Sequence, residues 1–260
     1  MSSKKNDARA LLLGYLKELR LPTFSESFEE LSRKAVQESL SYDRYLLELV
    51  ERECEERRRK RVERYLRESR LPLEKDFDSF NLKRLPKKVR QQVATLLEDT
   101  FLDRKENILA FGNPGSGKTH LVYAIAQELI RRDVRRIYSS TCSVLVQELL
   151  IAKRDLRLPK LLTRLRRFDA IVIDDIGYVQ QSRDEMEVLF TLLAESYERT
   201  SIILTSNLVF SKWEKIFKDP MTTVAAIDRL VHHSIILELN IPSYRAEEAE
   251  KKTKKGKGNE

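Results

Sequence analysis

The sequence predicts an α/β fold in which helices flank a parallel β-sheet, preceded by a small all-helical region. Three observations predict it. A glycine-rich loop separates a strand pattern from a helix pattern within residues 107–126, and two further apolar runs, 168–175 and 201–207, end in polar residues. Continuous apolar runs of this kind are typical of parallel strands that are buried on both faces. Residues 8–70, in contrast, show apolar residues at helical spacing and no strand pattern.

The positive charge of the chain is concentrated in one region. The chain has 260 residues, 35% of them charged, and a formal net charge of +8. This length allows one large domain or a domain of ordinary size with an appendage. Residues 131–167 contain eleven Lys and Arg but only three Asp and Glu, an excess equal to the net charge of the whole chain. Because excess positive charge attracts polyanions, this distribution favours a polyanionic partner.

The cysteines and the first residues favour a cytoplasmic protein with no membrane partner. Cys54 and Cys142 lie in segments that we expect to be far apart, and neither has a neighbour at metal-ligand spacing. Buried thiols in a reducing compartment are therefore favoured. The apolar run at residues 11–13 is soon followed by Lys17 and Glu18, so it predicts neither a signal peptide nor a membrane span.

Residues 1–70 are predicted to form a helical N-terminal domain. Pro72 ends its last helical run because proline lacks the backbone donor that a helix interior needs. Within it, residues 51–61 are dense in Glu and Arg, and they either contact nucleic acid or form a solvated helix with Glu–Arg pairs four residues apart. The core domain is expected at 71–245. Residues 246–260 have no apolar periodicity and are predicted to be a disordered basic tail.

Residues 112–119 match the pattern GxxxxGK[ST] of a phosphate-binding loop. Glycines let the backbone turn its amides inward, and the loop opens a predicted helix, so its N–H groups form a cup for a polyphosphate. Lys118 would reach the β- and γ-phosphates of ATP, and the Thr119 hydroxyl would ligate the bound Mg²⁺. A Gly-rich turn without a ligand is the alternative, but the flanking strand and helix favour a true site. We expect ATP to be bound by Gly112, Asn113, Pro114, Gly115, Ser116, Gly117, Lys118, Thr119 and His120.

Polar residues end two of the predicted strands. Asp174 and Asp175 end one, and Asn207 ends the next. Ligands gather at the carboxyl ends of parallel strands, so all three are expected beside the phosphate loop. Asp174 would hold Mg²⁺ through water, and Asp175 would orient the attacking water. Asn207 would contact the γ-phosphate or position water. The alternatives are that the acids cap the turn at Gly177 and that Asn207 is an ordinary turn former.

Two helix patterns, rather than one, separate the second and third predicted strands. This helical insertion covers about residues 141–167 and is rich in basic side chains with few acids between them. A nucleic-acid backbone is therefore favoured as its partner over a merely solvated face. The expected DNA-binding residues are Lys153, Arg154, Arg157, Lys160 and Arg164, with Arg166 and Arg167 beside them.

Two of the three histidines, His232 and His233, are adjacent in the sequence. Residues one apart do not share a helix face, so a packing or surface role is favoured over a metal site.

The ordered motifs resemble those of AAA+ ATPases of the initiator and helicase-loader group, which includes DnaA and DnaC. They are more closely similar to the IstB family, the ATPase helpers of insertion-sequence transposases. The residues that carry the resemblance are 112–121 (GNPGSGKTHL), 173–178 (IDDIGY), Thr205-Ser206-Asn207-Leu208 with Phe210 and Trp213, 228–233 (DRLVHH) and 243–245 (SYR). The resemblance covers residues 70–245 in order and spacing, and the helical N-terminal region is of the family's kind.

This resemblance implies roles that the residues alone do not. Arg229 matches the arginine finger that enters a neighbouring subunit's nucleotide site, so hydrolysis would require a homo-oligomer. Arg245 matches a second arginine sensor. The basic insertion resembles the element that follows the DNA backbone, and the N-terminal domain resembles the part that engages the transposase. The family usually has Asp-Glu where this chain has Asp174-Asp175, and the chain is too short after Asn207 for the separate helical lid of larger AAA+ enzymes.

The leading functional prediction is an ATPase that oligomerises on duplex target DNA, with ATP and Mg²⁺ as cofactors, and that recruits or stimulates a transposase. The alternative is a replicative helicase loader of the DnaC type, which would bind single-stranded DNA. The insertion lacks stacking aromatics apart from Phe168 at its end, so duplex DNA is favoured. A third possibility is an ATP-regulated scaffold that hardly hydrolyses ATP. It stays open because Asp175 is one methylene shorter than the Glu usual in the family, so its activation of water could be weaker.

Overall fold

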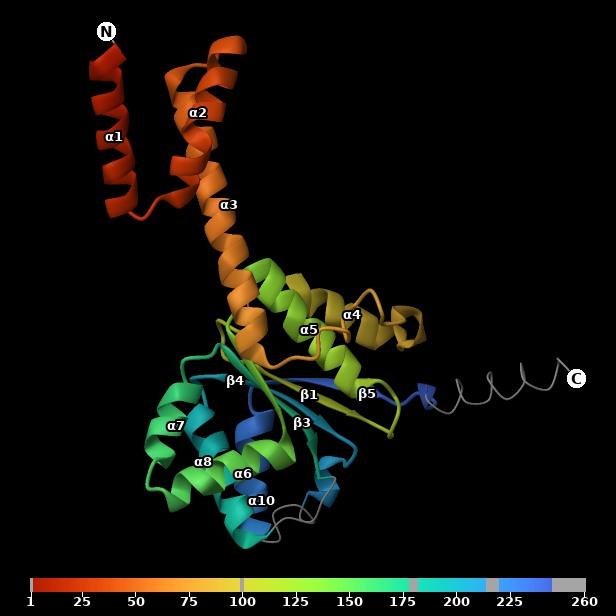
Figure 1. The fold of residues 1–260 in the computed structure, drawn as a ribbon. Helices are drawn as coiled ribbons and strands as arrows, with labels where there is room; N and C mark the ends of the chain where they lie inside the picture. Colours follow the sequence, from red (N-terminus) through yellow and green to blue (C-terminus); the bar gives the residue numbers. More distant parts are fainter. Residues whose placement is uncertain (1, 99–100, 178–181, 214–219, 245–260) are drawn as a thin grey trace, which may run out of the picture. The chain divides into compact units, whose positions relative to one another are not determined.

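A computed structural model of the chain describes residues 2–98, 101–177, 182–213 and 220–244 (Figure 1). The chain divides into two compact units, Met1–Arg64 and Tyr65–Glu260. The division falls inside helix α3 (Tyr42–Ser69). The domain limits given by the sequence therefore stay predictions, and the tail at 246–260 lies outside the described residues. None of the described helices is both long and apolar enough to cross a membrane.

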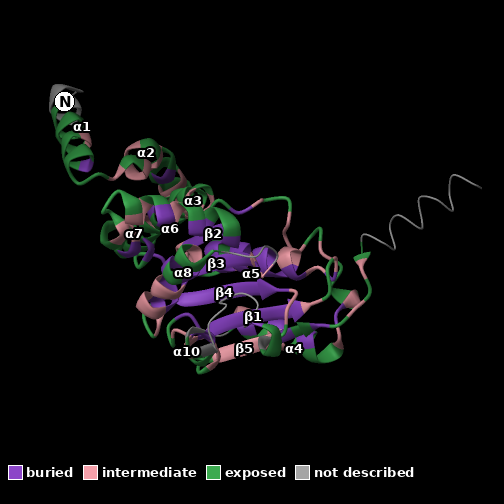
Figure 2. Cartoon of the chain, turned by 90° about the horizontal axis from the view of Figure 1, so that it is seen from below, coloured by how far each residue is buried: buried purple, intermediate pink, exposed green. Residues whose placement is uncertain are grey.

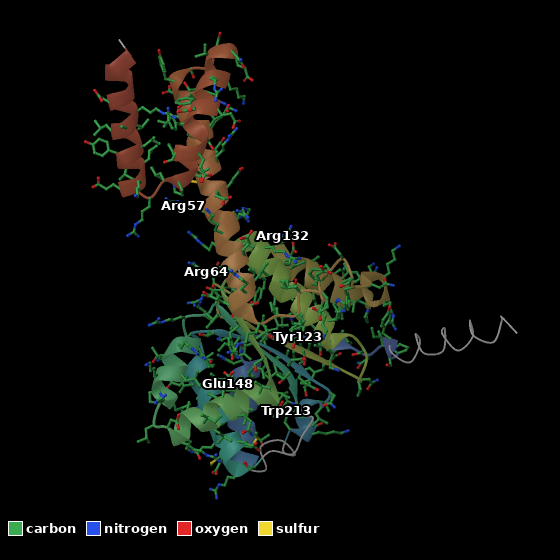
Figure 3. The ribbon with its side chains drawn as sticks, in the orientation of Figure 1. Arg57, Arg64, Tyr123, Arg132, Glu148 and Trp213 are labelled. Carbon is green, nitrogen blue, oxygen red and sulfur yellow. The ribbon has the colours of Figure 1, made fainter. Side chains whose placement is uncertain are left out.

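The first unit is helical, as the sequence predicts. It contains α1 (Ser2–Glu18), α2 (Pro22–Gln37) and most of α3. Glu53 of α3 is a buried acid that accepts the backbone N–H of Thr23 at 3.0 Å, which satisfies an unpaired donor at the start of α2. Burial alone would raise the pKa of Glu53, but hydrogen bonds from Arg57 and Thr23 outweigh it and lower the pKa. Figure 3 labels Arg57 on α3.

The charged stretch of α3 forms ion pairs along its own helix. Arg59 contacts both Glu56 and Glu63, and Glu56 also pairs with Lys60 at 3.1 Å. Pairs at this spacing stabilise a solvated helix by a few tenths of a kcal/mol each. These contacts favour the solvated-helix interpretation of residues 51–61 over the nucleic-acid interpretation.

The second unit is built on a five-stranded parallel sheet with the strand order β2-β3-β4-β1-β5. The three central strands are buried almost throughout, as Figure 2 shows by their colour. Parallel strands buried on both faces explain why their sequences are continuous apolar runs. The strands are β1 (Asn107–Gly112), β2 (Ile137–Thr141), β3 (Ala170–Ile176), β4 (Ser201–Ser206) and β5 (Ser234–Leu239).

Helices cover both faces of this sheet, which confirms the predicted fold class. One face carries α4 (Lys87–Glu98) and α5 (Lys118–Asp133), and the other carries α6, α8 and α10 (Figure 1). Both α6 and α7 lie between β2 and β3 in the chain. The helices after β2 are α6 (Cys142–Arg154), α7 (Leu158–Leu165), α8 (Arg183–Ser196) and α10 (Pro220–Val231). Two short 3-10 helices, η1 (Leu82–Arg84) and η2 (Phe210–Lys212), lie in the connections between other elements.

The two cysteines differ in exposure. Cys142 is buried at the start of α6, whereas Cys54 is exposed on α3. The prediction of buried thiols is therefore right for Cys142 and wrong for Cys54, because α3 turns Cys54 away from the apolar contacts of its unit.

Candidate functional site

The glycine-rich loop connects the end of β1 to the start of α5. Gly115 and Gly117 have φ angles of 77° and 92°, in the left-handed region that side chains with a Cβ avoid. Gly117 is the residue that precedes α5, and no side chain caps the helix there. The first backbone N–H groups of α5 can therefore bind an anionic ligand, which the helix dipole also favours.

Two polar groups inside the loop fit a polyphosphate. The Ser116 hydroxyl is buried and has no hydrogen-bond partner among the described residues. Lys118 is buried, and its Nζ donates to the carbonyl oxygens of Gly112 at 2.8 Å and Asn113 at 2.9 Å. Burial lowers the pKa of Lys118, although the nearby carboxylates act in the opposite direction. An ammonium and an orphaned hydroxyl beside free helix amides suit the phosphates of ATP.

Asp174 is the centre of the hydrogen-bond network beside the loop. Its Oδ1 accepts the hydroxyl of Thr119 at 2.8 Å and the hydroxyl of Thr205 at 2.6 Å. Its Oδ2 accepts the phenol of Tyr123 at 3.1 Å, from the α5 position labelled in Figure 3. Hydroxyl and carboxylate oxygens are the ligands that Mg²⁺ prefers. The adjacent oxygens of Thr119 and Asp174 therefore fit Mg²⁺, and these are the residues that would hold it.

Asp175 lies in an irregularity of the sheet. The β3–β4 register shifts there, so that Asp174 and Asp175 together face Thr205, between the pairs Ile173–Leu204 and Ile176–Ser206. Bulges of this kind are common next to active sites because they redirect a side chain. Asp175 has φ 66°, a conformation in which Asp and Asn are enriched among non-glycine residues. The left-handed backbone at this position therefore suits an Asp.

Two segments distant in sequence border the loop and line a cavity of about 70 Å³. The backbone N–H of Tyr244, after β5, donates to the Gly115 carbonyl at 2.9 Å. Arg84 donates to the Pro242 carbonyl at 3.2 Å and lies 4.9 Å from the centre of the Tyr244 ring. Residues 241–244 and 79–84 thus border the loop.

His120 belongs to this cavity rather than to the phosphate cup. Its Nε2 lies 2.9 Å from the Asp76 carbonyl oxygen and 3.1 Å from the Ser79 hydroxyl. Its ring also meets Phe80 edge-on with centroids 5.0 Å apart. His120 therefore ties α5 to the segment before η1.

The loop packs closely against β5 at Gly112. A Cβ at Gly112 would lie 2.4 Å from the Leu239 carbonyl oxygen, a backbone atom that cannot rotate away. We expect Gly112→Ala to lower the free energy of unfolding of the second unit by about 1–3 kcal/mol, as overpacking does. Urea unfolding measures this. The control is Gly14→Ala in α1, where a Cβ meets nothing within 4 Å, and an equal loss in both variants would contradict the close approach.

Asn207 lies just after β4, beside the loop. Its Oδ1 is buried without a hydrogen-bond partner among the described residues. Together with Gly112 and Asn113 it lines a cavity of about 240 Å³. The chain is fixed beyond it by the fully buried Trp213, whose Nε1 donates to the Leu208 carbonyl at 3.1 Å. The position suits a polar group that contacts a ligand in the loop.

Arg229 lies at the surface of α10, on the rim of a cavity of about 700 Å³. Its side chain is partly exposed, donates to the Ala225 carbonyl at 2.9 Å and lies 5.2 Å from the centre of the Phe190 ring. The guanidinium is thus held against its own helix while remaining accessible. Arg245, the other predicted arginine sensor, lies outside the described residues.

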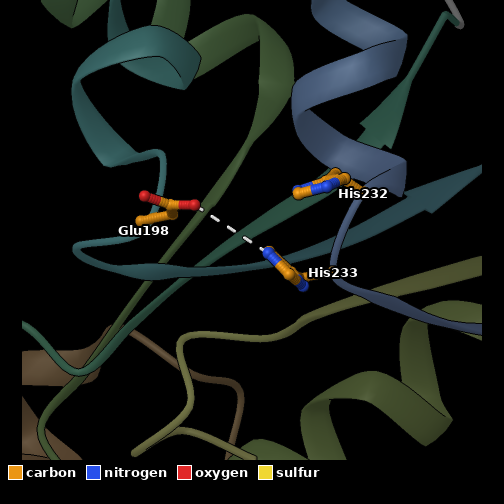
Figure 4. Close-up of side chains that lie close together, drawn as sticks. All are labelled: Glu198, His232 and His233. Carbon is orange, nitrogen blue, oxygen red and sulfur yellow. Dashed lines mark ion pairs between the residues drawn. The ribbon is translucent and has the colours of Figure 1, made fainter.

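The two histidines after α10 are exposed and lie close to Glu198 (Figure 4). His233 Nε2 is 3.9 Å from Glu198 Oε1, and His232 Nδ1 is 3.0 Å from the Tyr197 hydroxyl. The possible ligand atoms of the three residues lie within 4.8 Å of one another. The exposure of both histidines and the partners that both rings already have agree with a surface role.

The basic residues of the insertion differ in their surroundings. Lys153 pairs with Glu187 of α8 at 2.8 Å, and Arg166 approaches Glu195 at 3.5 Å. Few acids lie within the insertion itself, but α8 supplies these two acids from a distant part of the sequence. Four of the predicted DNA-binding residues are exposed: Arg154, Arg157, Lys160 and Arg164. The last three also line a cavity of about 770 Å³ between α6 and α7.

Sequence reasoning missed the roles of Thr205 and Tyr123 in this site. Each is a hydroxyl-bearing residue inside an otherwise apolar stretch, and that interruption is the signal that could have revealed them. Which partner each hydroxyl meets depends on the pairing of β3 with β4 and on the approach of α5 to the sheet. Neither can be read from local sequence.

The strand order, the phosphate loop and the helical insertion define a phosphate-loop protein with the AAA+ fold. The chain belongs to the family of IstB-like ATP binding proteins, whose family model matches residues 14–252. An insertion-sequence ATP-binding protein of Sinorhizobium fredii is 40% identical over 235 residues, covering 90% of this chain and 78% of that one. The insertion sequence IS21 ATP-binding protein of Pseudomonas aeruginosa is 34% identical over 236 residues, covering 91% and 89%. The resemblance predicted from the sequence is confirmed.

Solved structures agree on the fold. The DnaC helicase loader is similar with a TM-score of 0.55 at 16% identity, over 69% of this chain and 99% of that chain. AMPPCP-bound DnaA from Aquifex aeolicus is similar with a TM-score of 0.54 at 20% identity, over 72% of this chain and 57% of that chain. Likeness at these identities shows a shared AAA+ fold.

Proposed function

We propose that this protein is an ATP-dependent regulator of DNA transposition that oligomerises on duplex target DNA and recruits or stimulates a transposase. The observation that carries the proposal is the presence, in one unit, of a phosphate loop next to Asp174 and of an insertion whose basic side chains are exposed. The insertion-sequence ATP-binding proteins among its relatives support the link to transposition.

ATP would be bound by the loop amides and Lys118, and Mg²⁺ by Thr119 and Asp174. When bound, the metal ion neutralises charge that develops on the phosphates. The Asp175 carboxylate would accept a hydrogen bond from the attacking water and orient it, and the Asn207 amide would contact the γ-phosphate. Arg229 would supply its charge to the site of a neighbouring subunit, which would make hydrolysis depend on assembly.

The exposed cations of the insertion would neutralise DNA phosphates. Such contacts carry no base information, so affinity should vary little with sequence and fall steeply with salt. We expect Arg154→Glu/Arg157→Glu/Lys160→Glu to weaken duplex binding about equally for all sequences. The slope of log affinity against log salt should fall by about 0.9 for each phosphate contact that is lost. Fluorescence anisotropy across a salt series measures both.

The matched control is Lys87→Glu/Lys88→Glu/Arg90→Glu, which also reverses three exposed charges but on α4, on the opposite face of the sheet. This control should lose much less affinity for duplex DNA than the variant of the insertion does. Equal losses in the two variants would mean that net charge alone matters and would remove the insertion from the DNA surface. A wild-type preference for single strands over duplex would instead favour a helicase loader.

Turnover with and without duplex DNA distinguishes an ATPase from a scaffold. We expect duplex DNA to stimulate hydrolysis because assembly on DNA would bring Arg229 of one subunit to the site of another. Hydrolysis that is absent or insensitive to DNA would favour a nucleotide-regulated scaffold.

A further inference from the structure

One buried side chain, Thr205, contacts both acids of the proposed site. Its Oγ1 donates to Asp174 Oδ1 at 2.6 Å and accepts the backbone N–H of Asp175 at 2.7 Å. Thr205 is 1% exposed, so no water competes for these bonds. A single hydroxyl thus fixes the carboxylate of one acid and the main chain of the other.

The sheet irregularity explains why a side chain is needed there. Where two residues of β3 face one residue of β4, the extra residue loses its backbone partner in the ladder. A buried N–H without a partner costs about 1–3 kcal/mol. The Thr205 hydroxyl accepts this N–H and so stabilises the left-handed conformation of Asp175, which sets the direction of its side chain.

Tyr123 approaches Asp174 from a different element. It lies on α5, is 6% exposed, and donates to Asp174 Oδ2 at 3.1 Å. A tyrosine phenol is protonated at neutral pH, so it is a hydrogen-bond donor to this carboxylate. Thr205 thus holds both acids, whereas the Tyr123 hydroxyl holds Asp174.

We propose that Thr205 and Tyr123 are positioning residues, which hold the Asp174 carboxylate for Mg²⁺, and that Thr205 in addition aims Asp175 at the water. This inference rests on the proposed function. Thr119 donates to Asp174 in this structure, and the phosphate-loop motif requires its oxygen for the metal ion. When Thr119 turns to that task, Thr205 and Tyr123 still give each carboxylate oxygen a hydrogen bond.

The two residues therefore have different expected effects. Groups that orient a metal ligand typically contribute about 10–100-fold to metal affinity. Tyr123→Phe should raise the Mg²⁺ concentration needed for half-maximal nucleotide binding by about 10-fold, and it should lower turnover at saturating Mg²⁺ less than Thr205→Val does. Thr205→Val should raise that Mg²⁺ concentration similarly. It should also lower turnover at saturating Mg²⁺, because the backbone N–H of Asp175 loses its hydrogen bond to the Thr205 hydroxyl.

Binding of a fluorescent ATP analogue, titrated with Mg²⁺, gives a readout that does not depend on hydrolysis. With EDTA present, both variants should bind the analogue as the wild type does, because the phosphate loop is intact. Thr205→Ser keeps the hydroxyl and should restore the wild-type Mg²⁺ dependence to within about threefold, against the 10–100-fold expected for loss of the contact. Matched controls are Thr191→Val on α8, whose hydroxyl bonds Glu187 of its own helix, and Tyr45→Phe in the helical unit.

An unchanged Mg²⁺ dependence in Tyr123→Phe would overturn the inference, and so would a failure of Thr205→Ser to rescue. If Thr205→Val fails to fold, Tyr123→Phe still tests whether the Asp174 carboxylate needs the hydrogen bond from Tyr123 to bind Mg²⁺. A wild-type protein that binds nucleotide with this Mg²⁺ dependence but ignores DNA would overturn the proposed function alone. A wild-type protein whose nucleotide binding is indifferent to Mg²⁺ would contradict both.

Discussion

Lys118→Ala is expected to abolish both ATP binding at working concentrations and the assembly that depends on it. Lys118 is the one cation buried inside the phosphate loop in the described part of the chain, where its Nζ lies between the carbonyl oxygens of Gly112 and Asn113. A charged hydrogen bond contributes about 1.5–3 kcal/mol, so its loss should weaken ATP binding by at least about tenfold. Isothermal titration with ATP and Mg²⁺ measures the affinity.

Lys87→Ala is the matched control for this substitution, since it removes an exposed lysine from the neighbouring helix α4. It should bind ATP and assemble as the wild type does. Nucleotide-dependent oligomers that persist unchanged in Lys118→Ala would show that the loop is not the site that governs assembly. Circular dichroism checks that both variants are folded.

Arg229→Ala is expected to leave ATP binding intact and to stop hydrolysis. The side chain lies on the surface of α10, where it contacts the Ala225 carbonyl of its own helix and the Phe190 ring of α8. Its truncation should therefore leave the ATP affinity of each subunit unchanged. An arginine supplied to a transition state in trans is worth about 10³–10⁵ in kcat. Turnover on duplex DNA under ATP saturation measures the loss.

Mixing subunits distinguishes action between subunits from action within one. Asp175→Asn removes the carboxylate but keeps a residue that tolerates the left-handed backbone at this position. Each variant alone should be nearly inactive. In mixed oligomers, an Arg229 from the Asp175→Asn subunit can complete a neighbouring site that retains Asp175, so turnover should return. No recovery in mixtures that demonstrably co-assemble would assign Arg229 to its own subunit.

The fold could be predicted because its strongest signals are local. The apolar runs of β1, β3 and β4 show directly in sequence that these strands are buried on both faces. Gly115 and Gly117 mark the loop because the backbone needs φ above zero there. The contact between Thr119 and Asp174, 55 residues apart, was predicted because parallel strands bring their carboxyl ends to one edge.

The rest of the site depends on packing between elements. The register shift beside Asp175 and the bond from Thr205 arise only once β3 pairs with β4. The cover over the loop comes from Tyr244 and Arg84, which lie 160 residues apart in the sequence. Lys153 looked like an unneutralised cation because the sequence does not show that α8 places Glu187 beside it.

We propose that ATP, bound by Lys118, Thr119 and Asp174, controls assembly on duplex DNA. Sedimentation velocity of the wild-type protein with a duplex tests this control when it is measured in ATP with Mg²⁺, in ADP with Mg²⁺ and without nucleotide. We expect a large protein–DNA complex in ATP and Mg²⁺, and a marked decrease in its sedimentation coefficient in the other two conditions. The same sedimentation coefficient in all three conditions would contradict the claim.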